Sequence, residues 1–261
     1  MTRQILLTIS YDGTAYCGFQ VQPNGVSVEG LLNEALSKIA GHPVTILGCS
    51  RTDAGVHAEG QRASFFLNGR IPTSHICNAV NGILPADIVV TKAEEVPMDF
   101  HCRHDAVGKH YRYTIRNTAL TSPFDRNFCY HFPGKLDAEK MKNAVPLFLG
   151  EKDFKAFTAS NSGRNDFVRR LDAITIKSSG DYIFLDFWGG GFLYKMVRSI
   201  AGSLIDIGRG YFDTDTIEKA FATGDRSLLS LTAPSKGLSL IKIYYNDEYY
   251  LDKDNSLSYN I

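Results

Sequence analysis

Apolar positions between residues 28 and 39 recur with the period of an amphipathic helix. They are Val28, Leu31, Leu32, Ala35, Leu36 and Ile39. The spacing i, i+3, i+4, i+7, i+8 and i+11 places them on one helical face. Ser27 is a typical N-cap and Gly41 a typical helix stop. A similar apolar stripe predicts a second long helix over 192–206.

Shorter β-rich runs predict strands that alternate with helices in both halves of the chain. The predicted strands are 5–10, 44–49, 62–66, 88–95, 111–116, 171–178, 182–188 and 240–245. Further helices are predicted at 74–83, 137–149 and 214–222, although Pro146 is unfavourable inside a helix. Helices with one apolar face that pack on a mainly antiparallel sheet form an α+β fold.

Regular structure is interrupted between residues 116 and 132. Pro123 and Pro133 lie at this point. We therefore expect an N-terminal α+β lobe of residues 1–116 and a C-terminal α+β lobe of residues 117–261. The two halves are similar in pattern but show no internal sequence repeat.

The composition is that of a globular protein with no net charge. Of the 261 residues, 44% are hydrophobic and 21% charged, and 28 basic residues balance 28 acidic ones. A nucleic-acid binder is often basic, so this balance argues mildly against one. The stretch 99–131 is nevertheless locally basic. It contains Arg103, Lys109, Arg112, Arg116 and Arg126. A polarised surface can therefore coexist with zero net charge.

The cysteines and the apolar runs indicate the cytoplasm. Five cysteines, widely spaced and without a CxxC pair, argue against a disulfide framework or a thiolate zinc site. No run approaches the ~18 apolar residues of a membrane-spanning helix. The apolar run at the N-terminus is too short for a signal peptide.

The densest chemical signal is the loop at residues 50–58, which has the sequence SRTDAGVHA. Asp53 lies two residues from Arg51, among small residues. A nearby cation lowers the pKa of a carboxyl group and keeps it ionised, so that it can act as a nucleophile or a base. The alternative, about equally expected from the loop alone, is an Asx-turn in which Asp53 only accepts backbone hydrogen bonds.

A second signal is the segment 189–198, where three glycines precede the second predicted helix. Helix N-termini bind anions, but the segment matches no nucleotide-binding fingerprint. Lys195 and Arg198 lie one turn apart on the predicted helix and could bind phosphate or a carboxylate. A solvated helix face is the simpler alternative.

A third signal is the segment 109–113, with the sequence KHYRY. Strand alternation places Lys109, Tyr111 and Tyr113 on one face, and His110 and Arg112 on the other. Aromatic side chains interleaved with cations stack bases and hold nucleic-acid backbones. An amphipathic edge strand with buried tyrosines is equally compatible with the pattern.

Histidines near acidic residues raise the question of a metal site. His57 follows Asp53 by four positions, and His101, His104 and His110 lie close in sequence. None of these residues has the H-E-x-x-H spacing or a comparable ligand set. We therefore predict no metal site.

These segments together resemble one family. The run 50–58 resembles the signature loop of the TruA family of tRNA pseudouridine synthases. Other similar stretches follow in the family's order, at 11–14, 18–22, 60–61, 84–88, 109–113, 153–157, 192–198 and 233–238. The resemblance covers nearly the whole chain. Two departures are Lys152, where the family often has His, and Cys102, where alanine is common.

The resemblance implies both a fold and a reaction. The implied fold has two similar lobes around a central, mostly antiparallel sheet, with helices packed on it and an active-site cleft between the lobes. The implied protein is a homodimer that holds the anticodon stem-loop of tRNA. It isomerises uridine to pseudouridine at positions 38, 39 and 40 in tRNA numbering, without metal or cofactor.

The resemblance also implies roles for individual residues. Asp53 matches the catalytic aspartate, and Arg51 would help to displace the flipped base. Tyr111 matches the tyrosine that stacks on the uracil and can take the C5 proton, and Arg198 the arginine that pairs with the aspartate. We further expect Lys109 and Lys195 to bind the substrate.

Three other interpretations remain open at this point. A non-catalytic RNA-binding protein could use the same tyrosines and basic residues. A metal-dependent phosphodiesterase could be built from Asp53, His57 and the histidines at 101–110. A pseudouridine synthase could also act on a different RNA.

Overall fold

The chain forms two compact units. A computed structural model describes residues 2–159, 166–229 and 232–258. Unit 1 comprises Met1–Ala106 with Ser239–Tyr245, and unit 2 comprises Val107–Leu238 with Asn246–Ile261. Each unit combines a mainly antiparallel sheet with helices, which confirms the predicted α+β class.

The sheet of unit 1 has the strand order β4-β1-β3-β10, with β2 paired to β3. The strands are β1 (Thr2–Tyr11), β2 (Leu47–Gly48), β3 (His57–Asn68), β4 (Ile88–Val96) and β10 (Leu238–Tyr244). β1 is antiparallel to both β3 and β4. β10 is parallel to β3 and pairs Ser239 with His57 and Leu240 with Ala58.

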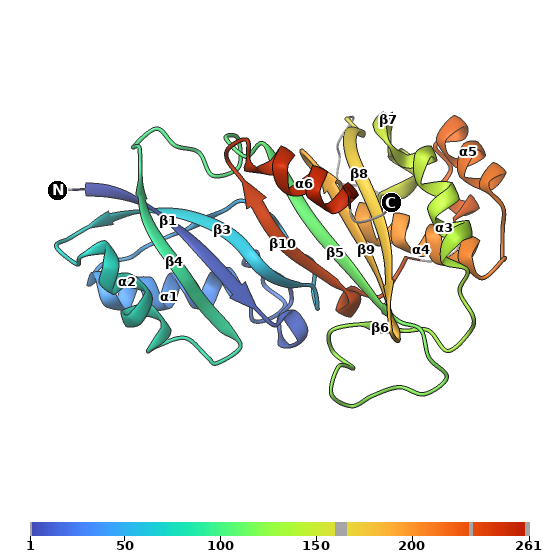
Figure 1. The fold of residues 1–261 in the computed structure, drawn as a ribbon. Helices are drawn as coiled ribbons and strands as arrows, with labels where there is room; N and C mark the ends of the chain where they lie inside the picture. The colour runs from blue at the N-terminus through green and yellow to red at the C-terminus, as the bar shows by residue number, and fades with distance from the viewer. Residues whose placement is uncertain (1, 160–165, 230–231, 259–261) are drawn as a thin grey trace. The chain divides into compact units, whose positions relative to one another are not determined.

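Two helices lie against this sheet in Figure 1, α1 (Val28–Ala40) and α2 (Thr73–Asn81). The ends of α1 confirm the prediction. Ser27 Oγ accepts the backbone N–H of Gly30 at 3.2 Å, and Gly41 ends the helix in the left-handed region at φ 71°. Both caps satisfy backbone groups that a helix end leaves without an internal partner. The predicted strand 44–49 is shorter than expected, since only Leu47–Gly48 pairs with β3.

The sheet of unit 2 has the strand order β5-β9-β8-β7, with β6 paired in parallel to β5. The strands are β5 (Gly108–Arg116), β6 (Tyr130–His131), β7 (Gly150–Asp153), β8 (Val168–Ser179) and β9 (Tyr182–Gly189). β8 and β9 form the predicted hairpin. Gly180 occupies its turn at φ 55°, a region that glycine enters without steric cost.

The helices of unit 2 are α3 (Ala138–Ala144), α4 (Met196–Gly208), α5 (Thr214–Thr223) and α6 (Glu248–Ser258). Figure 1 shows α3, α4 and α5 grouped beside β7, β8 and β9. The prediction of one helix over 137–149 is wrong at its C-terminal end. α3 stops at Ala144, and Pro146 lies in the 3-10 helix Val145–Phe148, because proline has no N–H to continue an α-helix.

The unit boundaries differ from the lobe boundary placed after residue 116. β5 packs within unit 2, whereas the sequence analysis assigned residues 108–116 to the N-terminal lobe. The segment Ser239–Tyr245 joins unit 1, although it lies near the C-terminus. The division into an N-terminal lobe 1–116 that carries the catalytic loop and a C-terminal lobe 117–261 that completes the cleft stays a prediction.

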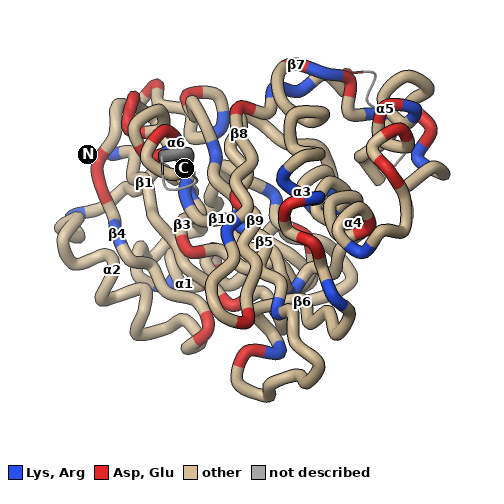
Figure 2. The backbone as a smooth tube through the Cα atoms, turned by 45° about the vertical axis from the view of Figure 1, so that its right-hand side comes forward, with Lys and Arg blue, Asp and Glu red and all other residues tan. Residues whose placement is uncertain are grey.

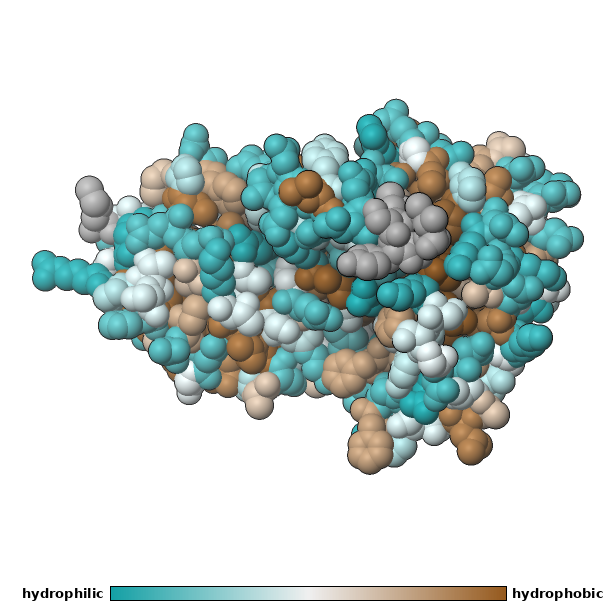
Figure 3. Space-filling model, viewed as in Figure 1, coloured by the Kyte–Doolittle hydropathy of each residue, from teal (hydrophilic) through white to brown (hydrophobic). Residues whose placement is uncertain are grey.

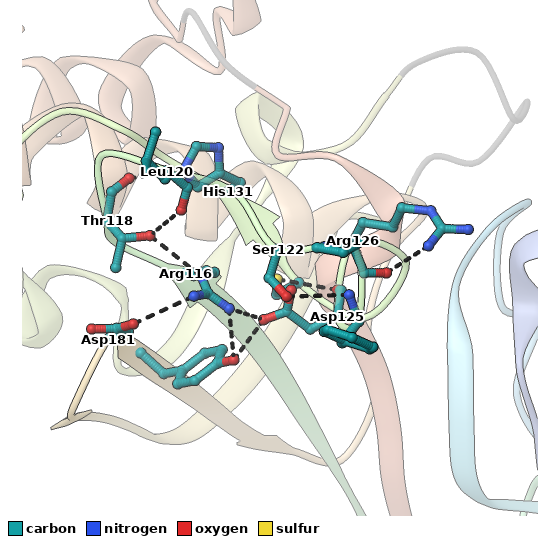
Figure 4. Close-up of polar contacts among 12 residues, drawn as sticks. Arg116, Thr118, Leu120, Ser122, Asp125, Arg126, His131 and Asp181 are labelled. Atoms are coloured by element: carbon teal, nitrogen blue, oxygen red, sulfur yellow. Dashed lines mark hydrogen bonds and ion pairs between the residues drawn. The ribbon is translucent and has the colours of Figure 1, made fainter.

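The connection between β5 and β6 is held by polar contacts, shown in Figure 4. Arg116 Nη1 donates to Asp125 Oδ2 at 2.7 Å, and Tyr182 Oη donates to the same oxygen at 2.5 Å. The bond from Tyr182 and the guanidinium of Arg116 outweigh desolvation and lower the pKa of Asp125. His131 Nε2 lies 2.8 Å from the carbonyl oxygen of Thr118. Part of the locally basic stretch is therefore occupied by internal contacts.

Candidate active site

The loop at residues 50–57 leaves the sheet after β2 and returns into β3. Asp53 lies near its middle and forms an isolated antiparallel bridge with Gly18. The carbonyl oxygen of Asp53 accepts the N–H of Val56 at 3.1 Å, which closes the turn. Arg51 is exposed and Asp53 half-buried. The structure therefore places both predicted residues of this loop in one short segment at the surface of unit 1.

The same loop is attached to the interior of unit 1 through Thr52, which is buried. Its hydroxyl lies 2.7 Å from the hydroxyl of Tyr11, and its carbonyl oxygen accepts the N–H of Phe19 at 3.1 Å. Burial raises the pKa of Tyr11, so this phenol stays protonated at physiological pH. The two stretches 11–14 and 18–22, noted in the sequence, thus contact the loop directly.

Asp12 and Gly13 lie against the C-terminal end of the loop. The N–H of Gly13 donates to His57 Nδ1 at 3.0 Å, and Asp12 Oδ1 lies 3.1 Å from the same nitrogen. Burial alone would raise the pKa of Asp12, but hydrogen bonds from the hydroxyl and the backbone N–H of Thr14 lower it. A Cβ at Gly13 would lie 2.0 Å from the carbonyl oxygen of Val56. Only glycine allows this close approach to the loop.

The histidines considered for a metal site are divided between the two units. The rings of His101 and His104 lie in unit 1 with centroids 4.0 Å apart, whereas His110 belongs to β5 in unit 2. Over residues 2–159, 166–229 and 232–258, no group of three or more His, Cys, Asp or Glu side chains could hold a metal ion. Within the same residues, no helix is long and apolar enough to cross a membrane.

Tyr111 lies on β5 in unit 2. Its side chain is mostly buried, and its ring packs nearly perpendicular to that of Phe192 at a centroid distance of 5.1 Å. Tyr113 on the same strand face is fully buried and donates its hydroxyl to the carbonyl oxygen of Pro234 at 2.9 Å. Tyr113 is therefore a core residue, as the alternative with buried tyrosines predicted, and Lys109 is half-buried at the start of the strand.

Arg198 belongs to α4, every residue of which the structure describes. It is the one residue of this helix that is not buried. Its Nε–H donates to the carbonyl oxygen of Ala233 at 2.8 Å, and its own carbonyl oxygen accepts the N–H of Ala233 at 3.0 Å. Helix α4 therefore has no wide solvated face, because its other residues are buried and Arg198 itself is half-buried and held in place; the exposed Tyr194 lies before the helix.

Lys195 precedes α4 and has a left-handed backbone at φ 59°. The expected helix start at 192 and the spacing of Lys195 and Arg198 on one helical turn are therefore wrong. The glycines at 189–191 end β9 and are separated from the first helical residue, Met196, so they do not form a phosphate-binding helix N-terminus. The ammonium group of Lys195 lies 4.9 Å from the centre of the Tyr194 ring.

A buried ion pair on the opposite face of β5 was not predicted. Asp186 of β9 lies 2.5 Å from His110 Nε2 and accepts Arg112 Nε–H at 2.9 Å. Burial alone would raise the pKa of Asp186, but these hydrogen bonds lower it. A hollow of about 210 Å³ adjoins this pair, lined by Arg112, Lys177, Ser179, Phe184 and Asp186. None of the predicted site residues lines this hollow. The sequence signal that could have indicated the ion pair is Asp186, an acidic residue within the otherwise apolar strand β9.

Charged and apolar side chains are both dispersed. Figure 2 shows basic and acidic residues interspersed along the tube rather than separated by sign. Apolar residues are scattered over the face shown in Figure 3. Two of the most exposed are Leu120 at 81% and Phe124 at 94%, in the loop of Figure 4. Basic and acidic positions are therefore mixed along the backbone in this view.

Comparison with known proteins assigns the family. A family model described as tRNA pseudouridine synthase matches residues 7–105 and 144–246. The tRNA pseudouridine synthase A of Geotalea uraniireducens is 43% identical over 243 residues, which are 93% of this chain and 100% of that protein. The chain belongs to the tRNA pseudouridine synthase family. The proteins of the same name from Geobacter sp. strain M21 and Thermoanaerobacter sp. strain X514 are 44% and 41% identical, over 93% of this chain and 99% and 100% of theirs.

Family membership makes the chain an isomerase of the pseudouridine synthase class. Arg51 and Asp53 lie in the first matched segment, and Lys195 and Arg198 in the second. Lys109 and Tyr111 fall between the two segments, so the family model itself does not cover them. The relatives, which align over 93% of the chain, confirm the resemblance inferred from the ordered motifs.

Proposed function

We propose that this chain isomerises uridine to pseudouridine in the anticodon stem-loop of tRNA, at positions 38, 39 and 40, with Asp53 as the catalytic carboxylate. The observation that carries the proposal is the loop at residues 50–57. It presents Arg51 and Asp53 at the surface of unit 1 while Thr52 between them is buried. A pseudouridine synthase needs such an accessible carboxylate on a fixed backbone.

The reaction breaks the N1–C1′ bond of uridine, turns the uracil and forms a C5–C1′ bond. The proton on C5 is lost and N1 gains one, so substrate and product have the same atoms. No electron acceptor and no water is consumed, so the chemistry can proceed with protein side chains alone. Asp53 would supply the anionic group, and we predict that no cofactor or metal takes part.

Tyr111 would support the base after it leaves its stack. Extruding a nucleotide costs a few kcal/mol, and stacking on an aromatic ring returns about 1–3 kcal/mol per base. The nearly perpendicular packing of Phe192 against Tyr111, at an interplanar angle of 78°, favours one orientation of the Tyr111 ring. We further propose that Lys109 and Lys195 contact phosphates and that Arg51 takes the place of the extruded base.

Arg198 would pair with Asp53 in the complex with tRNA. A guanidinium keeps a carboxylate ionised in a site from which water is excluded. The bond from Arg198 Nε–H to Ala233 restricts the plane of the guanidinium in unit 2. We also propose that the protein acts as a homodimer in the cytoplasm, which rests on the family resemblance alone.

The decisive experiment treats unmodified tRNA with purified protein and maps pseudouridine by position. Asp53→Asn should bind tRNA normally and form no detectable product, because the shape is kept and the charge is lost. Asp99→Asn makes the same chemical change at an exposed aspartate of unit 1 and should behave as the wild type. Substantial turnover by Asp53→Asn would remove its catalytic role, and product outside the anticodon stem-loop would refute the proposed target.

A further inference from the structure

Gln61, in β3, is completely buried and hydrogen-bonds the first residue of the loop twice. Its Oε1 accepts the N–H of Ser50 at 3.1 Å, and its Nε2–H donates to the carbonyl oxygen of Ser50 at 2.7 Å. One side-chain amide therefore satisfies both backbone groups of one residue. This is the pattern by which two neighbouring strands pair, here with a side chain in place of a strand.

The position of this contact follows from the path of the chain. The N–H of Cys49 still donates to the carbonyl oxygen of Arg62 at 2.8 Å, which is the last bond to β3 before the loop. Ser50 is buried, and buried backbone groups need hydrogen-bond partners where a chain turns away from a sheet. Gln61 replaces the missing strand partner and so determines where the loop begins.

Tyr11 forms a second attachment two residues further along. Its hydroxyl lies 2.7 Å from the Thr52 hydroxyl and accepts a longer bond of 3.5 Å from Gln61 Nε2. Tyr11, Gln61 and Thr52 thus form one buried hydrogen-bonded group. Such networks are rigid when every member has a partner, because each lost bond leaves a polar atom buried.

Burial alternates along the loop, so the network also determines which side chains face outward. Ser50 and Thr52 are buried, Arg51 is exposed and Asp53 is half-buried. In an extended segment, successive side chains point to opposite sides. Attachment of Ser50 and Thr52 to the interior therefore leaves Arg51 and Asp53 directed outward.

We propose that Gln61 and Tyr11 are positioning residues, which set the location of the Asp53 carboxylate by binding Ser50 and Thr52. This inference rests on the proposed catalytic role of Asp53. Both side chains are buried, so neither is open to a bound substrate. A displacement of the reacting group by about 1 Å can lower a rate a hundredfold, so the network should act on the chemical step and not on tRNA binding.

The test measures the single-turnover rate constant and the dissociation constant for tRNA separately. Tyr11→Phe and Thr52→Val each remove one hydroxyl from the same hydrogen bond and keep the side-chain shape. Each should lower the rate constant about tenfold with the dissociation constant unchanged. The double variant should be no slower than the slower single variant, and Thr52→Ser, which keeps the hydroxyl, should return to within about threefold of the wild type.

Gln61→Leu should lower the rate constant by about ten- to a hundredfold, and Gln4→Leu is its matched control. Gln4 is likewise buried in the sheet of unit 1 and donates to a backbone oxygen, that of Phe100 at 2.7 Å. The Gln4→Leu variant should be less thermally stable than the wild type but keep the wild-type rate constant at temperatures where it is folded. An equal loss of rate in both glutamine variants would overturn the inference, because it would indicate a general structural effect.

The inference and the proposed function can fail separately. If Asp53→Asn is inactive while Tyr11→Phe, Thr52→Val and Gln61→Leu keep wild-type rates, the positioning role is refuted and the catalytic assignment stands. If Asp53→Asn is active, the catalytic assignment fails whatever the other variants do. Weaker tRNA binding with an unchanged rate in the network variants would also contradict a positioning role.

Discussion

Gly18 offers a direct way to move the candidate catalytic loop from outside it. The residue bridges to Asp53 and has φ +116°, a backbone conformation that other residues rarely adopt. A Cβ at this position would lie 2.8 Å from the carbonyl oxygen of Thr52 and 3.3 Å from the carbonyl carbon of Asp53. Gly18→Ala therefore cannot be accommodated without movement of one of the two segments.

The size of the effect follows from these distances. Ordinary van der Waals contact begins at 3.4 Å, so the gap between Cβ and the Thr52 oxygen must grow by 0.6 Å, from 2.8 to 3.4 Å. The strained backbone adds about 1–3 kcal/mol. We expect Gly18→Ala to lower the free energy of unfolding by about 3 kcal/mol. A shift of this size in the loop should lower the single-turnover rate constant about tenfold.

Gly41→Ala is the matched control for this prediction. Gly41 also has a positive φ, +71°, but nothing lies within 4 Å of a Cβ there. The left-handed backbone should cost about 1–2 kcal/mol and leave the rate constant unchanged. Stability is measured by urea unfolding and the rate with excess enzyme over tRNA. If Gly18→Ala loses no more stability and no more activity than Gly41→Ala, the close packing of Gly18 does not fix the position of the loop, and the reasoning is refuted.

Three further predictions concern single groups. Asp186→Asn should lower the free energy of unfolding by about 1–3 kcal/mol near pH 7, because it removes the anion that accepts the hydrogen bonds of His110 and Arg112. Since the folded-state pKa of Asp186 is lowered, the stability that its charge contributes is present above the unfolded pKa of about 4 and is lost as pH falls through the folded-state pKa, so the difference from wild type should vanish in acid urea titrations. Ser27→Ala should cost about 1 kcal/mol in the same assay through loss of the α1 N-cap, and no change would contradict the cap. Arg198→Lys should lower the rate of pseudouridine formation at least tenfold, because a planar fork is replaced by a point charge, and an unchanged rate would dismiss the proposed pair with Asp53.

Helix α1 could be predicted from sequence because its causes are local. Periodicity, a serine cap and a terminal glycine all lie within fifteen residues of one another. Helix α4 was placed too early because Phe192 continues the apolar pattern. Hydrophobic periodicity indicates which side chains pack inside the protein, but not whether their backbone is helical. Phe192 packs against Tyr111 from a position before the helix begins. The backbone reversal at Lys195 leaves no trace in hydrophobicity.

Helix α6 was not predicted because its stabilising contacts are distant in the chain. Tyr249 donates its hydroxyl to Asp172 Oδ2 at 2.6 Å and lies 6.0 Å from the centre of the Trp188 ring. The same reason explains what was missed near the site. The loop was identified by its own residues, whereas Tyr11 and Gln61 reach it from positions 41 residues before Thr52 and 11 residues after Ser50.

The parallel pairing of β10 with β3 has a consequence for protein synthesis. Ser239 and Leu240 pair with His57 and Ala58, the first residues after the loop. A ribosome adds these partners only after residues 1–238 have been made, so the nascent chain exposes that stretch of β3 until then. An open strand edge is a site of misassociation. Premature termination before residue 239 would therefore yield a product that contains Asp53 yet cannot complete the sheet beneath it.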